Sequence, residues 1–249
     1  MNNLYCMEVI KPKTKIKIVF ISILVAFCLG FKNYALASKD FQNDLGLWSA
    51  VNVNVPITEK FQSRFQFSPR WLDDVTDFNQ FVLHALLGYK FNEHFSFYQG
   101  YAWSTRYIPN FKREQRPYQE LTISHNLKKL SVEHRFRFEE RFIQDIEGIT
   151  LRPRYRLKAS YPLDKKERWA LVLFDELFVN LNSHFGGPQA GIDQNRIYAG
   201  INHKFSERIS GDLGYQLQHQ HTKGSNLETL NHFVFFYLNF YLPTLVQNR

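Results

Sequence analysis

The chain has 249 residues, of which 16% are aromatic and only two are cysteine, and its formal net charge is +8. The aromatic content excludes a disordered protein, and the cysteine count excludes a disulfide scaffold. A mean hydropathy of −0.36 excludes a polytopic helical membrane protein, because such a protein needs several runs of about 20 apolar residues.

Residues 1–37 have the pattern of an export signal peptide. Four lysines between residues 11 and 17 precede an apolar run at 18–31, and the small-x-small sequence Ala35-Leu36-Ala37 follows it. The run is short for a transmembrane helix and typical of a cleaved signal. We predict cleavage after Ala37, which leaves residues 38–249 as one exported domain. The alternatives are an uncleaved anchor helix and a lipoprotein modified at Cys28.

Cleavage would remove both cysteines and half of the net charge. Residues 1–37 contain Cys6 and Cys28, five lysines and one glutamate, so the charge falls from +8 to +4. Excess positive charge is the electrostatic signature of nucleic-acid-binding proteins, and here much of it belongs to the signal. We therefore expect no nucleic-acid partner.

Eleven runs of alternating apolar and polar residues predict β-strands after the signal. They occupy residues 44–55, 61–71, 78–91, 95–107, 118–127, 130–142, 150–161, 169–180, 195–205, 209–220 and 228–242. Short turns alternate with longer loops, and the longer loops are predicted at 72–77, 108–117, 143–149, 181–194 and 221–227. This alternation is typical of bacterial outer-membrane barrels, and runs of this length suit tilted strands that cross a membrane.

The predicted fold class is all-β, a single antiparallel transmembrane β-barrel of 10 to 12 strands. Twelve strands are favoured, because an all-antiparallel closed barrel needs an even number with both chain ends on one side. The alternative is a secreted soluble barrel of the lipocalin type, with its apolar face inside. Aromatic residues at the ends of the runs favour the membrane barrel: Phe61, Trp71, Phe91, Phe95, Tyr107, Phe142, Tyr161, Trp169 and Phe205.

Charged residues concentrate on one face of the runs at 130–142 and 150–161. Neighbouring strands lie about 4.8 Å apart, so these side chains are expected to line one wall of the lumen. The predicted lumen charge network contains Arg135, Arg137, Glu139, Arg141, Arg152, Arg154, Arg156, Glu176 and Arg196. An open lumen would bind anions there. The interpretation we favour is that carboxylates neutralise the arginines and brace a filled lumen, the candidates being Glu133, Glu139, Glu176 and Asp212.

Other candidate sites are weaker. Ser124 and His125, with Glu140 on the next run, have the residue types of a lipid hydrolase, but consecutive strand residues point to opposite faces. His219 and His221, with His232 across a hairpin, lack a fixed third metal ligand. Gly186-Gly187-Pro188 marks a loop without phosphate-loop spacing. We predict no catalytic residue, no metal site and no cofactor.

Several stretches resemble the bacterial DUF2490 family. They are RPYQELTISH at 116–125, RFRFEERF at 135–142, RPRYRLKASY at 152–161, DELFVNLN at 175–182 and DQNRIY at 193–198, together with Leu47-Trp48 in the first run. The Arg-x-Arg-x-Glu-x-Arg pattern at 135–141 is the most specific of them. The resemblance implies an outer-membrane β-barrel of a Gram-negative bacterium without an assigned activity.

The predicted function is that of an outer-membrane barrel, structural or handling a narrow range of solutes, with no enzymatic activity and no identified substrate. The alternative is an outer-membrane enzyme that modifies lipid A or phospholipid. Predicted partners are outer-membrane lipid and, by implication, the barrel-assembly machinery. Because eight residues follow the aromatic pair Phe240-Tyr241, any terminal assembly signal is expected to be internal.

Overall fold

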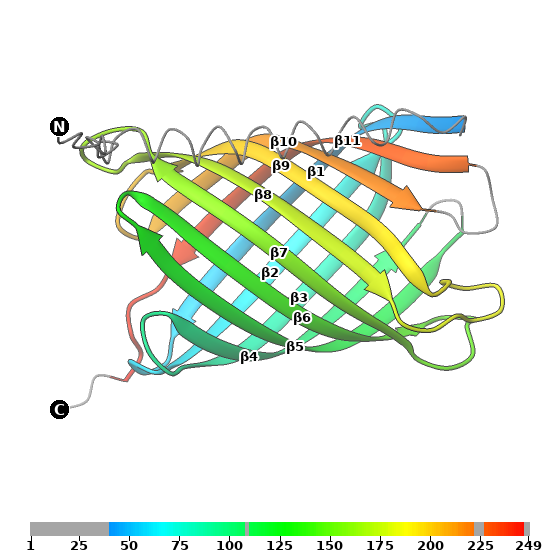
Figure 1. The fold of residues 1–249 in the computed structure, drawn as a ribbon, viewed down its shortest axis with the longest axis horizontal. Coiled ribbons are helices and arrows are strands. Elements are labelled where there is room, and N and C mark those ends of the chain that lie inside the picture. The colour runs from blue at the N-terminus through cyan, green and yellow to red at the C-terminus, as the bar shows by residue number, and fades with distance from the viewer. Residues whose placement is uncertain (1–39, 108–109, 222–226, 247–249) are drawn as a thin grey trace, which may run out of the picture. The chain divides into compact units, whose positions relative to one another are not determined.

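The structure, a computed structural model, describes residues 40–107, 110–221 and 227–246, without the side chains of residues 40–42 and 227. The predicted signal peptide lies outside the described residues. Those residues form a closed barrel of eleven strands (Figure 1). The strands are β1 (Asp40–Pro56), β2 (Phe61–Leu72), β3 (Asp77–Lys90), β4 (Phe95–Arg106), β5 (Lys112–Leu127), β6 (Leu130–Ile143), β7 (Thr150–Pro162), β8 (Trp169–Asn180), β9 (Gly191–Lys204), β10 (Ile209–His221) and β11 (Leu227–Tyr241). Within this part of the chain, no helix is long and apolar enough to span a membrane.

Every predicted run is a strand, but β5 and β9 begin earlier than predicted, at Lys112 and Gly191. The extension of β5 contains Pro117, which has no N–H for the ladder and is normally excluded from a strand paired on both sides. The strand pairing of β5 accommodates Pro117. Gln115 pairs with Phe142 and Tyr118 with Glu139, so the ladder to β6 is interrupted at Pro117, which pairs only with β4.

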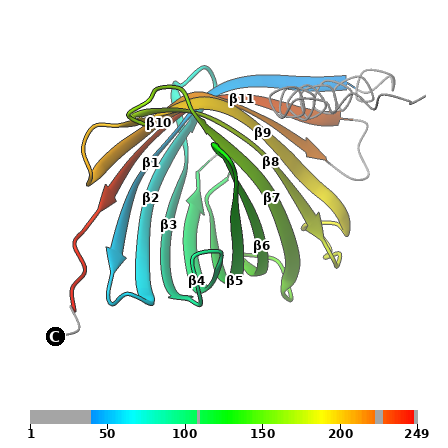
Figure 2. The ribbon, with the colours of Figure 1, turned by 60° about the vertical axis from the view of Figure 1, so that its left-hand side comes forward.

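The number of strands, eleven, lies within the predicted range of 10 to 12 but differs from the twelve that an all-antiparallel barrel favoured. Eleven strands close within the described residues because β1 and β11 run parallel, in a register from Asp40↔Leu227 to Asn54↔Tyr241, while all other neighbours are antiparallel. Figure 2 shows these two strands side by side. Across this parallel seam, Asn52 Nδ2 donates a hydrogen bond to Asn239 Oδ1 at 2.8 Å. One parallel pair allows a closed barrel with an odd number of strands. As a result, β1 begins at one end of the barrel and β11 finishes at the other.

The two ends of the barrel differ in their connections. The turn between β5 and β6 consists of residues 128–129, whereas the loop after β8 spans residues 181–190. We call the end with the loops after β2, β4, β6 and β8 the long-loop end, and the opposite end the short-turn end; Figure 1 shows them at the right and the left.

The alternation of each strand separates a charged inner face from an apolar outer face. In β6, Arg135 and Arg137 are buried inside the barrel, whereas the intervening Phe136 is 45% exposed. In β2, Phe65 and Phe67 are about half exposed on the outer face. This arrangement is the reverse of a lipocalin-type barrel, which buries its apolar face.

Aromatic rings pack inside the barrel against glycines of neighbouring strands. A Cβ atom added at Gly100 would overlap the ring of Tyr118, its partner in β5, and one added at Gly88 would overlap Tyr98. Tyr198 covers Gly214 of the neighbouring β10 in the same way, and also Gly200 of its own strand. Large rings fit at these positions because the facing residue has no side chain.

Candidate functional site

The register of β5, β6 and β7 places arginines directly opposite one another. Arg137 pairs with Arg154, and Arg135 pairs with Arg156, across β6 and β7. Like charges opposite each other destabilise a sheet, so carboxylates must lie between them. Three buried glutamates supply this charge, and each comes from a different strand: Glu120 from β5, Glu139 from β6 and Glu176 from β8.

Each glutamate contacts more than one arginine. Glu139 accepts hydrogen bonds from Arg152, at 2.9 Å from Nε and 2.6 Å from Nη2, and from Arg154 Nη1. Glu176 Oε1 lies 2.6 Å from Arg135 Nη2 and 2.7 Å from Arg154 Nη2. Charge-assisted bonds of this kind are stronger than bonds between neutral groups. We call this connected set the ion network; it consists of Glu120, Arg135, Arg137, Glu139, Arg152, Arg154 and Glu176.

Aromatic rings cover the ion network within the lumen. The Arg137 guanidinium carbon lies 4.2 Å from the centre of the Tyr118 ring, and that of Arg154 lies 4.1 Å from the centre of the Phe178 ring. Both rings are fully buried. The arginines are therefore held by carboxylates in their plane and by ring faces.

The predicted network residues have three different environments. Arg135, Arg137, Glu139, Arg152, Arg154 and Glu176 belong to the ion network. Arg141 and Arg156 lie at its margins, where they pair with Glu114 and Glu133 at 2.6 Å. Arg196 pairs with no carboxylate of the described residues; its Nε donates to Gln218 Oε1 at 3.0 Å, and its guanidinium lies over Trp48 and Phe178.

Sequence reasoning missed three carboxylates of this region. Glu120 bonds Arg137, Glu114 bonds Arg141, and Asp193 bonds Arg152 at 2.9 Å. Glu114 and Asp193 were assigned to loops, although Glu114, Arg116 and Glu120 share one parity of β5. Asp212, a predicted neutralising group, instead accepts hydrogen bonds from Asn202 and Asn239.

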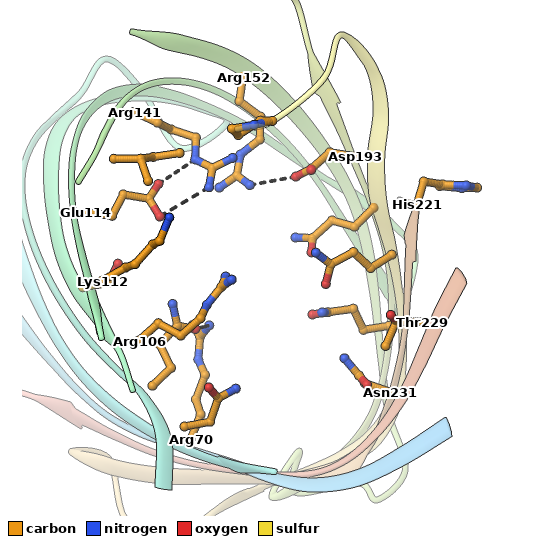
Figure 3. A pocket seen from close by; sticks show the side chains of 18 of the residues that line it. Arg70, Arg106, Lys112, Glu114, Arg141, Arg152, Asp193, His221, Thr229 and Asn231 are labelled. Atoms are coloured by element: carbon orange, nitrogen blue, oxygen red, sulfur yellow. Dashed lines mark hydrogen bonds and ion pairs between the residues drawn. The ribbon is translucent and has the colours of Figure 1, made fainter. Parts of the chain in front are cut away.

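A cavity of about 930 Å³ occupies the long-loop end of the lumen (Figure 3). Trp48, Arg152, Arg196 and Phe233 line its deepest part. Among the described residues, Tyr118, Arg154 and Tyr198 do not line it. The open space thus ends where the ion network and the packed rings begin. We call this cavity the vestibule.

The vestibule has an excess of positive charge. Seven arginines and one lysine line it, against three carboxylates: Asp44, Glu114 and Asp193. In Figure 3, Glu114 bonds Arg141 and Asp193 bonds Arg152. Within the described residues, Arg70, Arg106 and Arg196 have no carboxylate within ion-pair distance. Such a surface attracts anions, which arginine binds with two parallel hydrogen bonds.

A family model described as "Protein of unknown function (DUF2490)" matches residues 45–229, most of the chain. The chain belongs to the DUF2490 family. The match includes all of the ion network. An uncharacterized protein of Methylorubrum extorquens is 29% identical over 169 residues, which are 66% of this chain and 73% of that protein. No solved structure matches the chain. Neither the family description nor the name of this relative assigns an enzymatic activity.

The hydrolase-like residues of this DUF2490 chain do not form a site. Ser124 shares the inward parity of Glu120, whereas His125 lies on the outer face and stacks on His134 with ring centroids 5.4 Å apart. His125 pairs with Val132, and Glu140 lies eight residues further along β6, or about 27 Å at the rise of an antiparallel strand. These residues are too far apart to pair.

The histidines near the end of β10 form a cluster with a residue that sequence reasoning missed. Donor atoms of His219, His221 and Glu228 lie within 4.8 Å of one another, a ligand set of two imidazoles and one carboxylate that suits a transition metal. Glu228 already accepts hydrogen bonds from both histidines, which explains their approach without an ion. The predicted third member, His232, instead bonds the Tyr215 hydroxyl.

Proposed function

We propose that this DUF2490 protein is an outer-membrane β-barrel that has a closed lumen and an open vestibule. It is either a structural barrel or one that handles a narrow range of solutes through the vestibule, and it is not a general pore. By the pattern of bacterial outer-membrane barrels, the long-loop end faces the outside of the cell and the short turns face the periplasm.

The apolar outer face is the observation that carries this proposal. Large apolar side chains are exposed on strands around the whole barrel, including Leu87 (53%), Phe97 (40%), Tyr155 (37%) and Leu213 (59%). Monomeric soluble proteins rarely expose contiguous apolar patches larger than a few hundred Å². A lipid bilayer is the environment in which such a belt is stable.

Rows of aromatic contacts at both ends of the outer face support the same environment. At the long-loop end, Trp71, Phe78, Tyr107 and Phe111 follow one another with ring centroids 5.2 to 5.5 Å apart. At the short-turn end, a second row has centroids 5.0 to 5.2 Å apart and consists of Phe61, Tyr89, Phe91 and Phe95. Aromatic girdles at the two membrane interfaces are typical of transmembrane barrels.

Two layers of side chains support a closed lumen. The ion network lies on the inner face of β5 to β8, where the side chains of Arg137 and Glu139 are 7% and 1% exposed. Tyr98 and Tyr118 pack below it with Leu86 and Ala102 in one buried cluster. Small membrane barrels commonly fill their interior with side chains in this way.

Cell fractionation combined with gel mobility tests the proposal. A folded membrane barrel resists detergent, so the unboiled protein should migrate differently from the boiled protein, and it should sediment with the outer-membrane fraction. A matched soluble periplasmic protein serves as the fractionation control. Identical mobility before and after boiling, together with recovery in the soluble periplasm, would refute the membrane barrel.

A further inference from the structure

The vestibule has two chemically different walls. Figure 3 shows Arg70, Arg106 and Lys112 on one side of the open space, and Thr229 and Asn231 on the other. The first side is built by β2, β4 and β5, and the second by β9, β10 and β11. Cations and amides therefore face each other across the same cavity.

The basic wall has more charge than its own carboxylates neutralise. Glu114 is shared between Arg141 and Arg116, at 2.6 Å and 3.2 Å. Among the described residues, Arg70 bonds only the neutral Gln80, at 2.7 Å, and its guanidinium covers the Trp48 ring. Arg106 is exposed to the cavity and has no carboxylate partner among the described residues. These cations are oriented toward the open space without an internal counter-charge.

The amide wall offers both donors and acceptors. Gln194, Gln218 and Asn231 are nearly buried yet line the vestibule. Gln218 Oε1 accepts a hydrogen bond from Arg196, which leaves its NH₂ group to donate. In the part of the chain that the structure describes, the side chains of Gln194 and Asn231 make no hydrogen bond. Amide groups that both donate and accept suit hydroxyl groups, which do the same.

We infer that the vestibule binds a small hydroxylated anion of the class of uronic acids and sugar phosphates. The acid group lies against Arg70 and Arg106 of the basic wall, and the hydroxyl groups lie against the amide wall. A volume of about 930 Å³ is within the range of small-molecule sites, which span roughly 300 to 1,000 Å³. This inference rests on the proposed function only in placing the opening outside the cell.

The test uses residues 38–249 folded in detergent and titrated by calorimetry with four probes: glucuronate, glucose 6-phosphate, glucose and inorganic phosphate. We expect glucuronate and glucose 6-phosphate to bind about tenfold more tightly than glucose, because only they engage the arginines. Glucose 6-phosphate should also bind more tightly than inorganic phosphate, because only the sugar reaches the amide wall.

Single substitutions test which wall binds the acid group and which binds the hydroxyl groups. Arg106→Gln removes an exposed cation without breaking an ion pair and should weaken glucuronate about fivefold or more. Asn231→Ala should weaken glucose 6-phosphate but leave inorganic phosphate unchanged. The matched control is Arg64→Gln. Arg64 is also a lumen arginine without a carboxylate partner among the described residues, but it lies toward the short-turn end beside Asn54, so both probes should bind unchanged.

Three results would overturn the inference. The first is that no probe binds at about 10 mM, a concentration at which even weak sites fill. The second is that glucose binds with the same affinity as glucuronate, and the third is that inorganic phosphate binds with the same affinity as glucose 6-phosphate in both the native protein and Asn231→Ala. The heat-modifiable mobility of the same sample separates the two proposals. If the protein is a folded barrel but binds no probe, only the ligand inference is refuted. If it is a soluble periplasmic protein that binds the sugars, only the membrane location is refuted.

Discussion

Arg137 and Glu120 are directly opposed residues of β6 and β5, and Arg137 Nε lies 2.8 Å from Glu120 Oε2 inside the barrel. The Glu120 side chain is 1% exposed and that of Arg137 is 7% exposed. A buried pair of this kind adds little net stability compared with apolar packing, but the loss of one partner leaves an uncompensated charge. The loss of any one member of the ion network should therefore destabilise the barrel.

Replacing Glu139 tests how much the loss of one charge destabilises the barrel. Glu139→Gln keeps the shape of the side chain but removes the charge that Arg152 and Arg154 share. We expect the free energy of unfolding in urea to fall by about 3 to 5 kcal/mol, and by less where water enters the site. The control is Glu140→Gln on the outer face, which should change stability by less than about 0.5 kcal/mol. Equal effects of the two variants would contradict the network.

The contact between Gly100 and Tyr118 gives a second prediction. Gly100→Ala places a Cβ in the ring of Tyr118, which is fixed from the other side by Arg137 and by a hydrogen bond to His84. Overpacking of this kind should cost about 1 to 3 kcal/mol of unfolding free energy. In a Tyr118→Ala background the same change should cost little, because the ring is absent. Additive effects in this double-mutant cycle would exclude the packing explanation.

The parallel seam predicts one specific disulfide. Residues 38–249 contain no cysteine, so Asn52→Cys combined with Asn239→Cys introduces a single pair at directly opposed positions. We expect rapid crosslinking under mild oxidation, detected by gel mobility after boiling. The control pair, Asn52→Cys with Phe235→Cys, is displaced by four residues, or about 13 Å, and should not crosslink. Crosslinking of the control alone would show that the seam has another register.

Substitutions on the outer face distinguish lipid from water. Leu83→Arg lies midway along β3 and should lower the unfolding free energy in lipid vesicles by about 2 to 4 kcal/mol. Leu127→Arg, beside the β5–β6 turn, should cost about 0 to 1 kcal/mol, because arginine near the interface reaches water. Equally small effects at both positions would indicate that the outer face is in water.

The alternation of residues was sufficient to predict the strands, because each strand has one buried parity. It did not say which parity faces the lumen, and the aromatic residues at the ends of the runs were needed to favour a polar interior. The same parity places Arg135, Arg137 and Arg154 on the inner face, where all three are buried. The alternation did not predict the closure, because the partners at the seam are almost 200 positions apart and the turns do not fix their register. The alternation also did not place Glu114 on a strand, because the residues around Pro117 resembled a loop.

The excess charge of the vestibule was equally hidden in the sequence. Arg70 and Arg106 lie at the ends of runs, with no sequence feature that distinguishes them from arginines with a carboxylate partner. Their surroundings depend on contacts across the barrel, such as the approach of Arg70 to Trp48. Charge balance in the lumen is a property of the closed barrel rather than of any one strand.

Conductance is the most direct measurement of the closed lumen. Purified barrel in planar lipid bilayers should show no stable conductance, because in the proposed closed lumen the ion network and the packed rings block the path below the vestibule. A clear anion-selective conductance of the native protein, abolished by Arg137→Ala at unaltered stability, would contradict a closed lumen.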